Sequence, residues 1–243
     1  MSSDWTEKNR QTFEKMSRSY RADFAEGLKI LFKTVQAKRG WASDIWTDTE
    51  AGKGREIKML EYACGPGMVS MALAPFVTRI IGMDVSDGMV DEFNKNAQEE
   101  GMSDKMVGIK ADLLGESVPA EISGPEFYDF DVIVVSMALH HFQKPELAMS
   151  RLAERLKKGG VLTIIDIIPE HQDDKDNGLR HVTPSEVAET IHRHGFSQED
   201  MNKLYGDAGF ATGFKYQVIE EPLVFKKGDN VFHRTIFMAR AEL

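Results

Sequence analysis

The sequence has a single cysteine, Cys64, so no disulfide bond can form within the 243-residue chain. A chain without disulfides is typical of a reducing compartment. The longest apolar runs, "VIVVSMAL" and "VLTIIDII", are far shorter than the roughly 20 residues that a transmembrane helix needs. The first ten residues, "MSSDWTEKNR", lack the apolar core of a secretory signal. We therefore expect no membrane span and a cytoplasmic location, with the nucleus as an alternative.

Positive charge is scarce as well. The chain has 30 Lys and Arg against 39 Asp and Glu, a formal net charge of -9, and no basic stripe with interleaved aromatic residues. Such a surface offers little to a phosphate backbone, so nucleic acid is not an expected partner. The seven histidines show no metal-ligand spacing and have no second cysteine to join them. We expect no metal. The oligomeric state stays open.

What the chain does contain is an alternation of short apolar segments and amphipathic ones. Apolar residues recur at spacings of three and four through the first forty residues, which predicts helix, and a polar, glycine-rich stretch follows. Five β-branched segments then alternate with helical ones: "IKMLEYA", "RIIGMDVS", "MVGIKADLL", "FDVIVVSMAL" and "VLTIIDIIP". "KPELAMSRLAERLKKGG" is predicted to be a helix that closes with cations and glycines. This order is typical of a parallel, doubly wound sheet.

The C-terminal part breaks the alternation. "FKYQVIEEPLVFKK", the turn "GDN" and "VFHRTIFMARAEL" predict a β-hairpin. The fold class is therefore α/β: a doubly wound, Rossmann-like sheet of seven strands, mostly parallel, with a C-terminal antiparallel hairpin and N-terminal helices. We expect one domain over 1–243. Its expected parts are a helical cap and linker (1–55), a cofactor-binding core (56–168), a variable cap segment with a helix (169–212) and the hairpin (213–243).

The stretch "MLEYACGPGMVS" carries the first functional pattern. In a doubly wound sheet, ligands bind where strand order reverses, at the carboxyl ends of the strands. Gly65 and Gly67 allow a sharp turn and a close approach of backbone to ligand. The helix that follows offers free N–H groups to an anionic group of the ligand.

Three acids are expected just past successive strands. Glu61 precedes the glycine turn, Asp84 ends the second strand about twenty residues later, and Asp112 ends the third. Asp84 stands where a carboxylate commonly binds ribose hydroxyls, and Asp112 could accept a hydrogen bond from an adenine amino group. Each acid taken alone could merely cap a turn. Together they would repel a pyrophosphate and attract a ligand that carries a sulfonium and an ammonium.

With these pieces the chain resembles the class I S-adenosylmethionine-dependent methyltransferases, above all the branch typified by ubiquinone- and menaquinone-biosynthesis enzymes and related small-molecule methyltransferases. The matching pieces, in family order and covering roughly Ile57 to Asp166, are "LEYACGPG", "GMDVSDGMV", "KADLL", "FDVIVVSMALHHF" and "LKKGGVLTIID". One departure is Ala63, where the family usually has glycine. Its methyl group is expected to narrow the turn slightly.

The resemblance implies S-adenosylmethionine as cofactor, S-adenosylhomocysteine as product and a small-molecule methyl acceptor as partner. It also implies a place for each matched residue. The methionine part of the cofactor would meet Glu61, Ala63, Cys64, Gly65 and Gly67; the ribose and adenine would meet Asp84, Val85, Asp112 and Leu113; Ser136 and Met137 would lie beneath the sulfonium, and Tyr20 would close over the cofactor.

Methyl transfer to a protonated nucleophile benefits from a base. His140 is the first candidate and His141 the second, because both follow the fourth strand at the mouth of the expected site. Either histidine could instead be structural. His171, His181, His192 and His194 fall in the variable segment, where a solvated loop is expected. Cys64 is either a reactive thiol near a helix start or a compact residue that fills the loop.

Three functions remain in competition. The first is an enzyme that methylates a small molecule by in-line displacement, with methylation of a protein as a variant. The second is a methyltransferase-fold protein that regulates or binds a partner with little turnover. The third, a nicotinamide-dependent oxidoreductase, is disfavoured because Ser70 stands where the dinucleotide pattern wants a third glycine or alanine.

Overall fold

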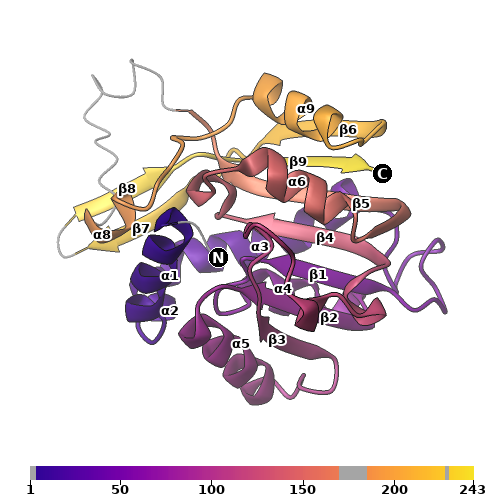
Figure 1. Cartoon of the computed structure of the whole chain (residues 1–243), viewed down its shortest axis with the longest axis horizontal. Helices are drawn as coiled ribbons and strands as arrows, with labels where there is room; N and C mark the ends of the chain where they lie inside the picture. The colour runs from indigo at the N-terminus through magenta and orange to yellow at the C-terminus, as the bar shows by residue number, and fades with distance from the viewer. Residues whose placement is uncertain (1–3, 170–184, 228–229) are drawn as a thin grey trace.

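The structure is a computed structural model that describes residues 4–169, 185–227 and 230–243 (Figure 1). Its helices are α1 (Asp4–Met16), α2 (Tyr20–Asp23), α3 (Ala25–Ala42), α4 (Met68–Leu73), α5 (Asp87–Glu99), α6 (Pro145–Ala153), α8 (Ser185–Ala188) and α9 (Gln198–Asp207). Its strands are β1 (Lys58–Tyr62), β2 (Arg79–Asp84), β3 (Met106–Lys110), β4 (Phe130–Ser136), β5 (Leu156–Ile167), β6 (Thr212–Val218), β7 (Leu223–Lys227), β8 (Asn230–Arg234) and β9 (Ile236–Glu242). Short 3-10 turns are η1 (Ala74–Phe76), η2 (Ala120–Ile122), η3 (Pro125–Phe127) and η4 (Leu139–His141).

Seven strands form the main sheet, in the order β3-β2-β1-β4-β5-β9-β6. The pairs from β3 to β5 are parallel, and β9 pairs antiparallel with both β5 and β6. The chain runs outward from β1 through β2 to β3, then crosses back to β4 on the other side of β1. The order therefore reverses between β1 and β4, where a doubly wound sheet binds its ligand. The predicted fold class is confirmed.

The core has two layers, one on each face of the sheet. Residues alternate along β1, so that Met59 packs on the face covered by α3 and α4 while Leu60 and Tyr62 pack on the face covered by α6 and α9. All three side chains are buried. Figure 1 shows α6 and α9 over one half of the sheet and α5 at its β3 edge. The sheet is therefore packed on both faces, and this packing fixes the positions of its strand ends.

The C-terminal hairpin is more elaborate than predicted. β6 and β9 join the main sheet, whereas β7 and β8 form a separate two-stranded sheet. Pairing continues to Ile219, whose N–H donates to the Ile236 carbonyl, and breaks at 220–222, where the sequence "EEP" ends in a proline that has no N–H to donate. The β7–β8 sheet instead reaches the N-terminal helices: the Phe225 ring lies 5.6 Å from that of Phe24, and it occupies the space that a Cβ on Gly27 would need.

The helix predicted to end at "KKGG" is also shorter than expected. α6 ends at Ala153, and Lys157–Gly160 belongs to β5. Pairing decides this: Phe130 N–H donates to the Arg155 carbonyl, and Gly159 N–H donates to the Leu243 carbonyl at the other edge. A strand with partners on both sides satisfies backbone groups that an extended helix end would leave to solvent.

The N-terminal helical region is divided into three helices rather than one. The hydroxyl of Ser17 donates to the Glu14 carbonyl and that of Ser19 to the Met16 carbonyl, and such local bonds compete with helix continuation. α1 therefore ends at Met16, and the next helix, α2, begins at Tyr20. Of the variable segment expected over 169–212, the part at 170–184, with His171 and His181, lies outside the described residues, and the rest contains α8 and α9. No helix in the described part of the chain is both long and apolar enough to cross a membrane.

Candidate active site

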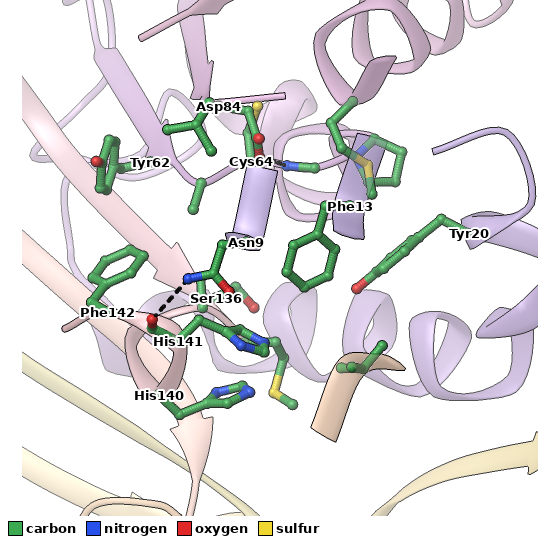
Figure 2. A pocket seen from close by; sticks show the side chains of 18 of the residues that line it. Asn9, Phe13, Tyr20, Tyr62, Cys64, Asp84, Ser136, His140, His141 and Phe142 are labelled. Atoms are coloured by element: carbon green, nitrogen blue, oxygen red, sulfur yellow. Dashed lines mark hydrogen bonds between the residues drawn. The ribbon is translucent and has the colours of Figure 1, made fainter. Parts of the chain in front are cut away.

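One cavity lies at the carboxyl ends of β1, β2 and β4, beneath α1, α2 and the β7–β8 sheet. It brings together twelve of the fourteen predicted site residues: Tyr20, Glu61, Ala63, Cys64, Gly65, Asp84, Val85, Asp112, Ser136, Met137, His140 and His141. Gly67 and Leu113 do not line it. Figure 2 shows the side chains around this space.

The turn after β1 uses the left-handed backbone region three times, at Ala63 (φ 54°), Gly65 (φ 50°) and Gly67 (φ 84°). A Cβ on Gly65 would meet nothing within 4 Å, so the backbone there faces open space. A Cβ on Gly67 would lie 2.6 Å from the Phe93 ring of α5. Helix packing and the positive φ thus both require glycine at position 67. At Ala63 the sequence predicts that the methyl group narrows the turn. Its effect in the structure is backbone strain, because a residue with a Cβ adopts the left-handed region there.

Glu61 lies within β1, one residue before its end, rather than past the strand as expected. Its carboxylate accepts hydrogen bonds from the backbone N–H (2.8 Å) and hydroxyl (2.5 Å) of Ser70. Burial raises the pKa of Glu61 to about 7 against the opposing effect of these bonds. A cation bound beside it would favour the ionised form.

Asp84, at the end of β2, holds the glycine turn in place. One carboxylate oxygen accepts from Gly65 N–H and the other from Ser86 N–H, each at 2.9 Å. Its side chain is buried, which raises its pKa, while the backbone N–H groups oppose that shift. Each oxygen keeps a lone pair that a ribose hydroxyl could use.

Asp112 lies two residues beyond β3, which ends at Lys110. Its Oδ1 accepts from the Leu114 N–H at 2.8 Å, and the residue lines the cavity. Leu113 points the other way: it is fully buried in the core, and its N–H lies 3.2 Å from the Tyr62 hydroxyl oxygen.

His140 is paired with a buried acid from the neighbouring strand. Its Nδ1 lies 2.7 Å from Oδ1 of Asp166, near the end of β5, and its backbone N–H donates to Oδ2 at 3.1 Å. Because a carboxylate accepts, the Nδ1 proton must donate to it, so in the neutral ring Nε2 has the free lone pair. His140 thus has the tautomer that a base needs.

His141 links several segments. Its Nδ1 lies 3.0 Å from the Thr190 carbonyl, and its own carbonyl accepts from Trp5 Nε1 (2.8 Å) and Asn9 Nδ2 (3.1 Å). The centroid of the ring lies 4.0 Å from that of His140, with the two planes tilted by 40°, and the ring meets Phe13 edge-on. Burial first, and then the adjacent His140, place the pKa of His141 well below its usual value. The low pKa keeps the ring neutral, and Thr190 holds its Nδ1.

The Cys64 thiol is buried near Asp84 and Glu61. Burial, together with Asp84 and Glu61, raises its pKa well above the ordinary value. A thiol in this state is a poor nucleophile, which favours the interpretation of Cys64 as a compact residue that fills the loop.

Several residues at the site are absent from the sequence-based set. Trp5, Asn9 and Phe13 of α1 line the cavity, and Asp166 orients His140. Asp166 carried a weak sequence signal, an acid at the end of the apolar run "VLTIID". The α1 residues carried none beyond helical spacing. No group of three or more His, Cys, Asp or Glu within the described residues could hold a metal ion.

Aromatic rings form the wall of the cavity away from the acids. The Phe13 and Tyr20 centroids lie 6.5 Å apart, those of Tyr20 and Phe24 4.6 Å apart, and Phe225 follows Phe24. Figure 2 shows Phe13 and Tyr20 projecting into the space from the N-terminal helices. The cavity thus has an acidic end and an aromatic end. At the acidic end, the carboxylates attract a cation and the backbone at Gly65 faces open space. This end therefore fits a nucleoside that carries a sulfonium.

Two curated proteins are similar to this chain over more than half of its length. An uncharacterized methyltransferase of Schizosaccharomyces pombe is 29% identical over 158 residues, which are 64% of this chain and 54% of that protein. The uncharacterized methyltransferase YcgJ of Bacillus subtilis is 26% identical over 190 residues, 75% of this chain and 66% of its own length. The chain thus spans about half to two thirds of the length of these curated relatives.

Solved structures share the fold. The crystal structure of magnesium protoporphyrin IX methyltransferase from Synechocystis with bound S-adenosylmethionine has a TM-score of 0.60 at 17% identity, covering 99% of both chains. A family model described as a methyltransferase domain matches residues 31–212, which include β1 to β5 and every predicted site residue except Tyr20. The chain therefore belongs to this methyltransferase domain family.

Proposed function

We propose that this methyltransferase acts on a small-molecule acceptor bound at the aromatic end of the cavity. The observation that carries the proposal is the cover over that end: α1, α2 and the β7–β8 sheet all contribute lining side chains, among them Trp5, Phe13, Phe24 and Phe225. A covered pocket with an aromatic wall suits a small apolar body. A protein side chain would have to enter beneath this cover.

The acidic end is proposed to hold the cofactor, whose sulfonium supplies an electrophilic methyl group. Asp84 would accept from the ribose hydroxyls, and Glu61 would face the ammonium of the methionine part. Ionisation of Glu61 beside that ammonium would offset the burial that raises its pKa to about 7. Alignment of methyl and nucleophile in a closed cavity accounts for the larger part of such catalysis, roughly 7–11 kcal/mol.

His140 is proposed as the base when the nucleophile carries a proton. The lone pair of the nucleophile forms a bond to the methyl carbon, the carbon–sulfur bond breaks, and its electron pair returns to sulfur. The proton of the nucleophile moves to Nε2 of His140, so one positive charge passes from sulfur to imidazole. Asp166, 2.7 Å from Nδ1, stabilises that imidazolium.

The base is tested with His140→Gln, assayed against a panel of phenols, amines and thiols. We expect turnover to fall by about 10²–10⁴-fold for acceptors that must lose a proton, with unchanged affinity for S-adenosylhomocysteine. His194→Gln is the control, because His194 is exposed and does not line the cavity. Equal turnover by the His140 variant and wild type across pH would remove His140 as base.

Cofactor placement is tested with Asp84→Ala and calorimetry. Affinity for S-adenosylhomocysteine should weaken by about 1.5–3 kcal/mol, the range for hydrogen bonds to a charged group. Asp131→Ala is the matched control: Asp131 is equally buried but binds Lys58 N–H and Lys157, away from the cavity. Cofactor binding without turnover across the acceptor panel, together with a co-purifying partner, would favour a regulatory role instead.

A further inference from the structure

We propose that Asn9 recognises the methyl acceptor, and that its Oδ1 atom accepts a hydrogen bond from a hydroxyl or N–H group on an otherwise apolar molecule. This inference rests on the proposed function of the cavity and names the chemical class of its ligand.

The orientation of the Asn9 amide is determined by its neighbour. Nδ2 lies 3.1 Å from the carbonyl oxygen of His141, drawn as the dashed line in Figure 2. A carbonyl oxygen can only accept, so the amide nitrogen must face it, since the flipped amide would set oxygen against oxygen. Oδ1 therefore points away from the His141 loop.

Oδ1 has no hydrogen-bond partner within the described residues. Asn9 is 9% exposed and lines the cavity, and Oδ1 itself is withdrawn from water. A buried polar atom without a partner is unfavourable, and most in folded proteins have one. A ligand that donates a hydrogen bond would supply what the protein lacks here.

His140 narrows which ligand fits. In the neutral ring, Nε2 of His140 carries a lone pair, because the Nδ1 proton faces Asp166. Oδ1 of Asn9 and Nε2 of His140 are then both acceptors, so a donor group on the ligand would match them, whereas a carboxylate would bring only a further acceptor to these two atoms. The surrounding rings of Trp5 and Phe13 fit an apolar, flat body. The class is therefore neutral phenols, alcohols and N–H heterocycles.

The test compares matched probes on protein saturated with S-adenosylhomocysteine. The probes are 2-naphthol with 2-methoxynaphthalene, indole with 1-methylindole, and 2-naphthoate, each titrated by ligand-observed NMR. We expect each donor to bind about 3- to 10-fold more tightly than its methylated counterpart, and 2-naphthoate to bind most weakly. Equal affinities within both pairs, or no binding of any probe in the cavity, would overturn the inference.

The second step uses two variants that affect the same carbonyl. Asn9→Leu keeps the approximate volume of the side chain and removes Oδ1; Trp5→Phe removes the other donor to the His141 carbonyl and leaves Oδ1 in place. The leucine variant should lose the preference for donors, while its affinity for S-adenosylhomocysteine stays within twofold. The phenylalanine variant should keep the preference.

Other outcomes would contradict this role. If both variants lose the preference alike, Asn9 acts only by holding the His141 loop. If Asn9→Leu weakens S-adenosylhomocysteine tenfold, Oδ1 serves the cofactor. If the leucine variant does not fold, the comparison of probes on the wild-type protein still tests the preference for donors. Because binding is measured without turnover, a donor preference in a protein that methylates nothing would support Asn9 and reject the proposed enzymatic role.

Discussion

Two residues beside the cavity adopt a backbone conformation that favours glycine. Ala63 and Met137 both have φ near 54°, and they follow β1 and β4, the two strands between which the order reverses. For an L-residue this region costs about 1–2 kcal/mol relative to the right-handed one. Two of the three non-glycine residues with positive φ in the described part of the chain thus lie at the site, and the third is Asp129, which does not line the cavity.

Replacing Ala63 with glycine should relieve that strain. We expect Ala63→Gly to raise the free energy of unfolding by about 1 kcal/mol, measured by urea denaturation. The control is Ala37→Gly in α3, an exposed helical position, which should lower the free energy of unfolding by about 1 kcal/mol. Changes of the same sign at both positions would show that the backbone at Ala63 is not strained.

Glu61 should make stability depend on pH in the absence of ligand. Its pKa is raised from 4.5 to about 7, so between these values the unfolded chain loses a proton that the folded protein retains. The stabilising contribution is complete below pH 4.5 and is lost as the pH rises to about 7, a change of roughly 3 kcal/mol in the free energy of unfolding.

Denaturation of wild type and Glu61→Gln at several pH values checks this expectation. The difference in unfolding free energy between the two proteins should change across pH 4.5–7 and level off above it. The exposed Glu99→Gln serves as the control and should show no such change. Parallel pH profiles for wild type and the Glu61 variant would mean that Glu61 ionises normally in the folded protein.

At the scale of elements, the main feature is the contact between α5 and the sheet, which the ring of Phe93 makes. Phe93 is fully buried, and the Cβ positions of Gly67, Gly82 and Gly108 lie 2.6, 2.5 and 2.9 Å from its nearest atoms. Three glycines from the cavity turn, β2 and β3 thus form a socket for this side chain. The contact couples the position of α5, which begins three residues after Asp84, to the turn that lines the cavity.

A methyl group in this socket should be costly. Gly82→Ala is expected to lower the free energy of unfolding by about 1–3 kcal/mol through overpacking. Adding Phe93→Leu should recover part of that loss, so that the double variant is more stable than the sum of the single changes predicts. Gly40→Ala in α3, where a Cβ meets nothing, should stabilise by about 0.5–1 kcal/mol. Strict additivity of Gly82→Ala and Phe93→Leu would exclude the socket.

At the scale of the whole molecule, the cavity is closed by segments distant in sequence. α1 docks at one end through Trp5 and Asn9 on the His141 carbonyl. At the other end Glu14 accepts from the Ser86 hydroxyl (2.7 Å) and Gly88 N–H (3.0 Å) at the start of α5. These bonds lower the pKa of Glu14. The cover over the site is thus tied to loops that follow β2 and β4.

Removing the Glu14 contact should loosen α1. We expect Glu14→Ala to speed hydrogen exchange of α1 amides and dissociation of S-adenosylhomocysteine by about fivefold each. That corresponds to about 1 kcal/mol, a charge-assisted contact weakened by partial solvent exposure. Glu7→Ala is the matched control on the same helix, since Glu7 bonds only to Arg10 and Gln11 of α1 in the described structure. Equal exchange in both variants would show that Glu14 does not hold the helix.

The sequence by itself determined the fold class, the family and the gathering of most site residues. Periodicity identifies each strand, and parallel strands bring their carboxyl ends to one edge. Residues as distant as Glu61, Asp84, Asp112 and Ser136 therefore had to meet there. These inferences need only local patterns and the geometry common to all doubly wound sheets.

Only the tertiary structure decided what each side chain does at that edge. Gly67 leaves room for Phe93, His140 meets Asp166 26 residues away, and Asn9 meets a carbonyl 132 residues away. The split of the C-terminal hairpin and the extension of β5 through "KKGG" likewise follow from partners elsewhere in the chain. The physical reason is that such contacts depend on packing between distant segments, and a local pattern of residues carries no record of which segment will lie opposite.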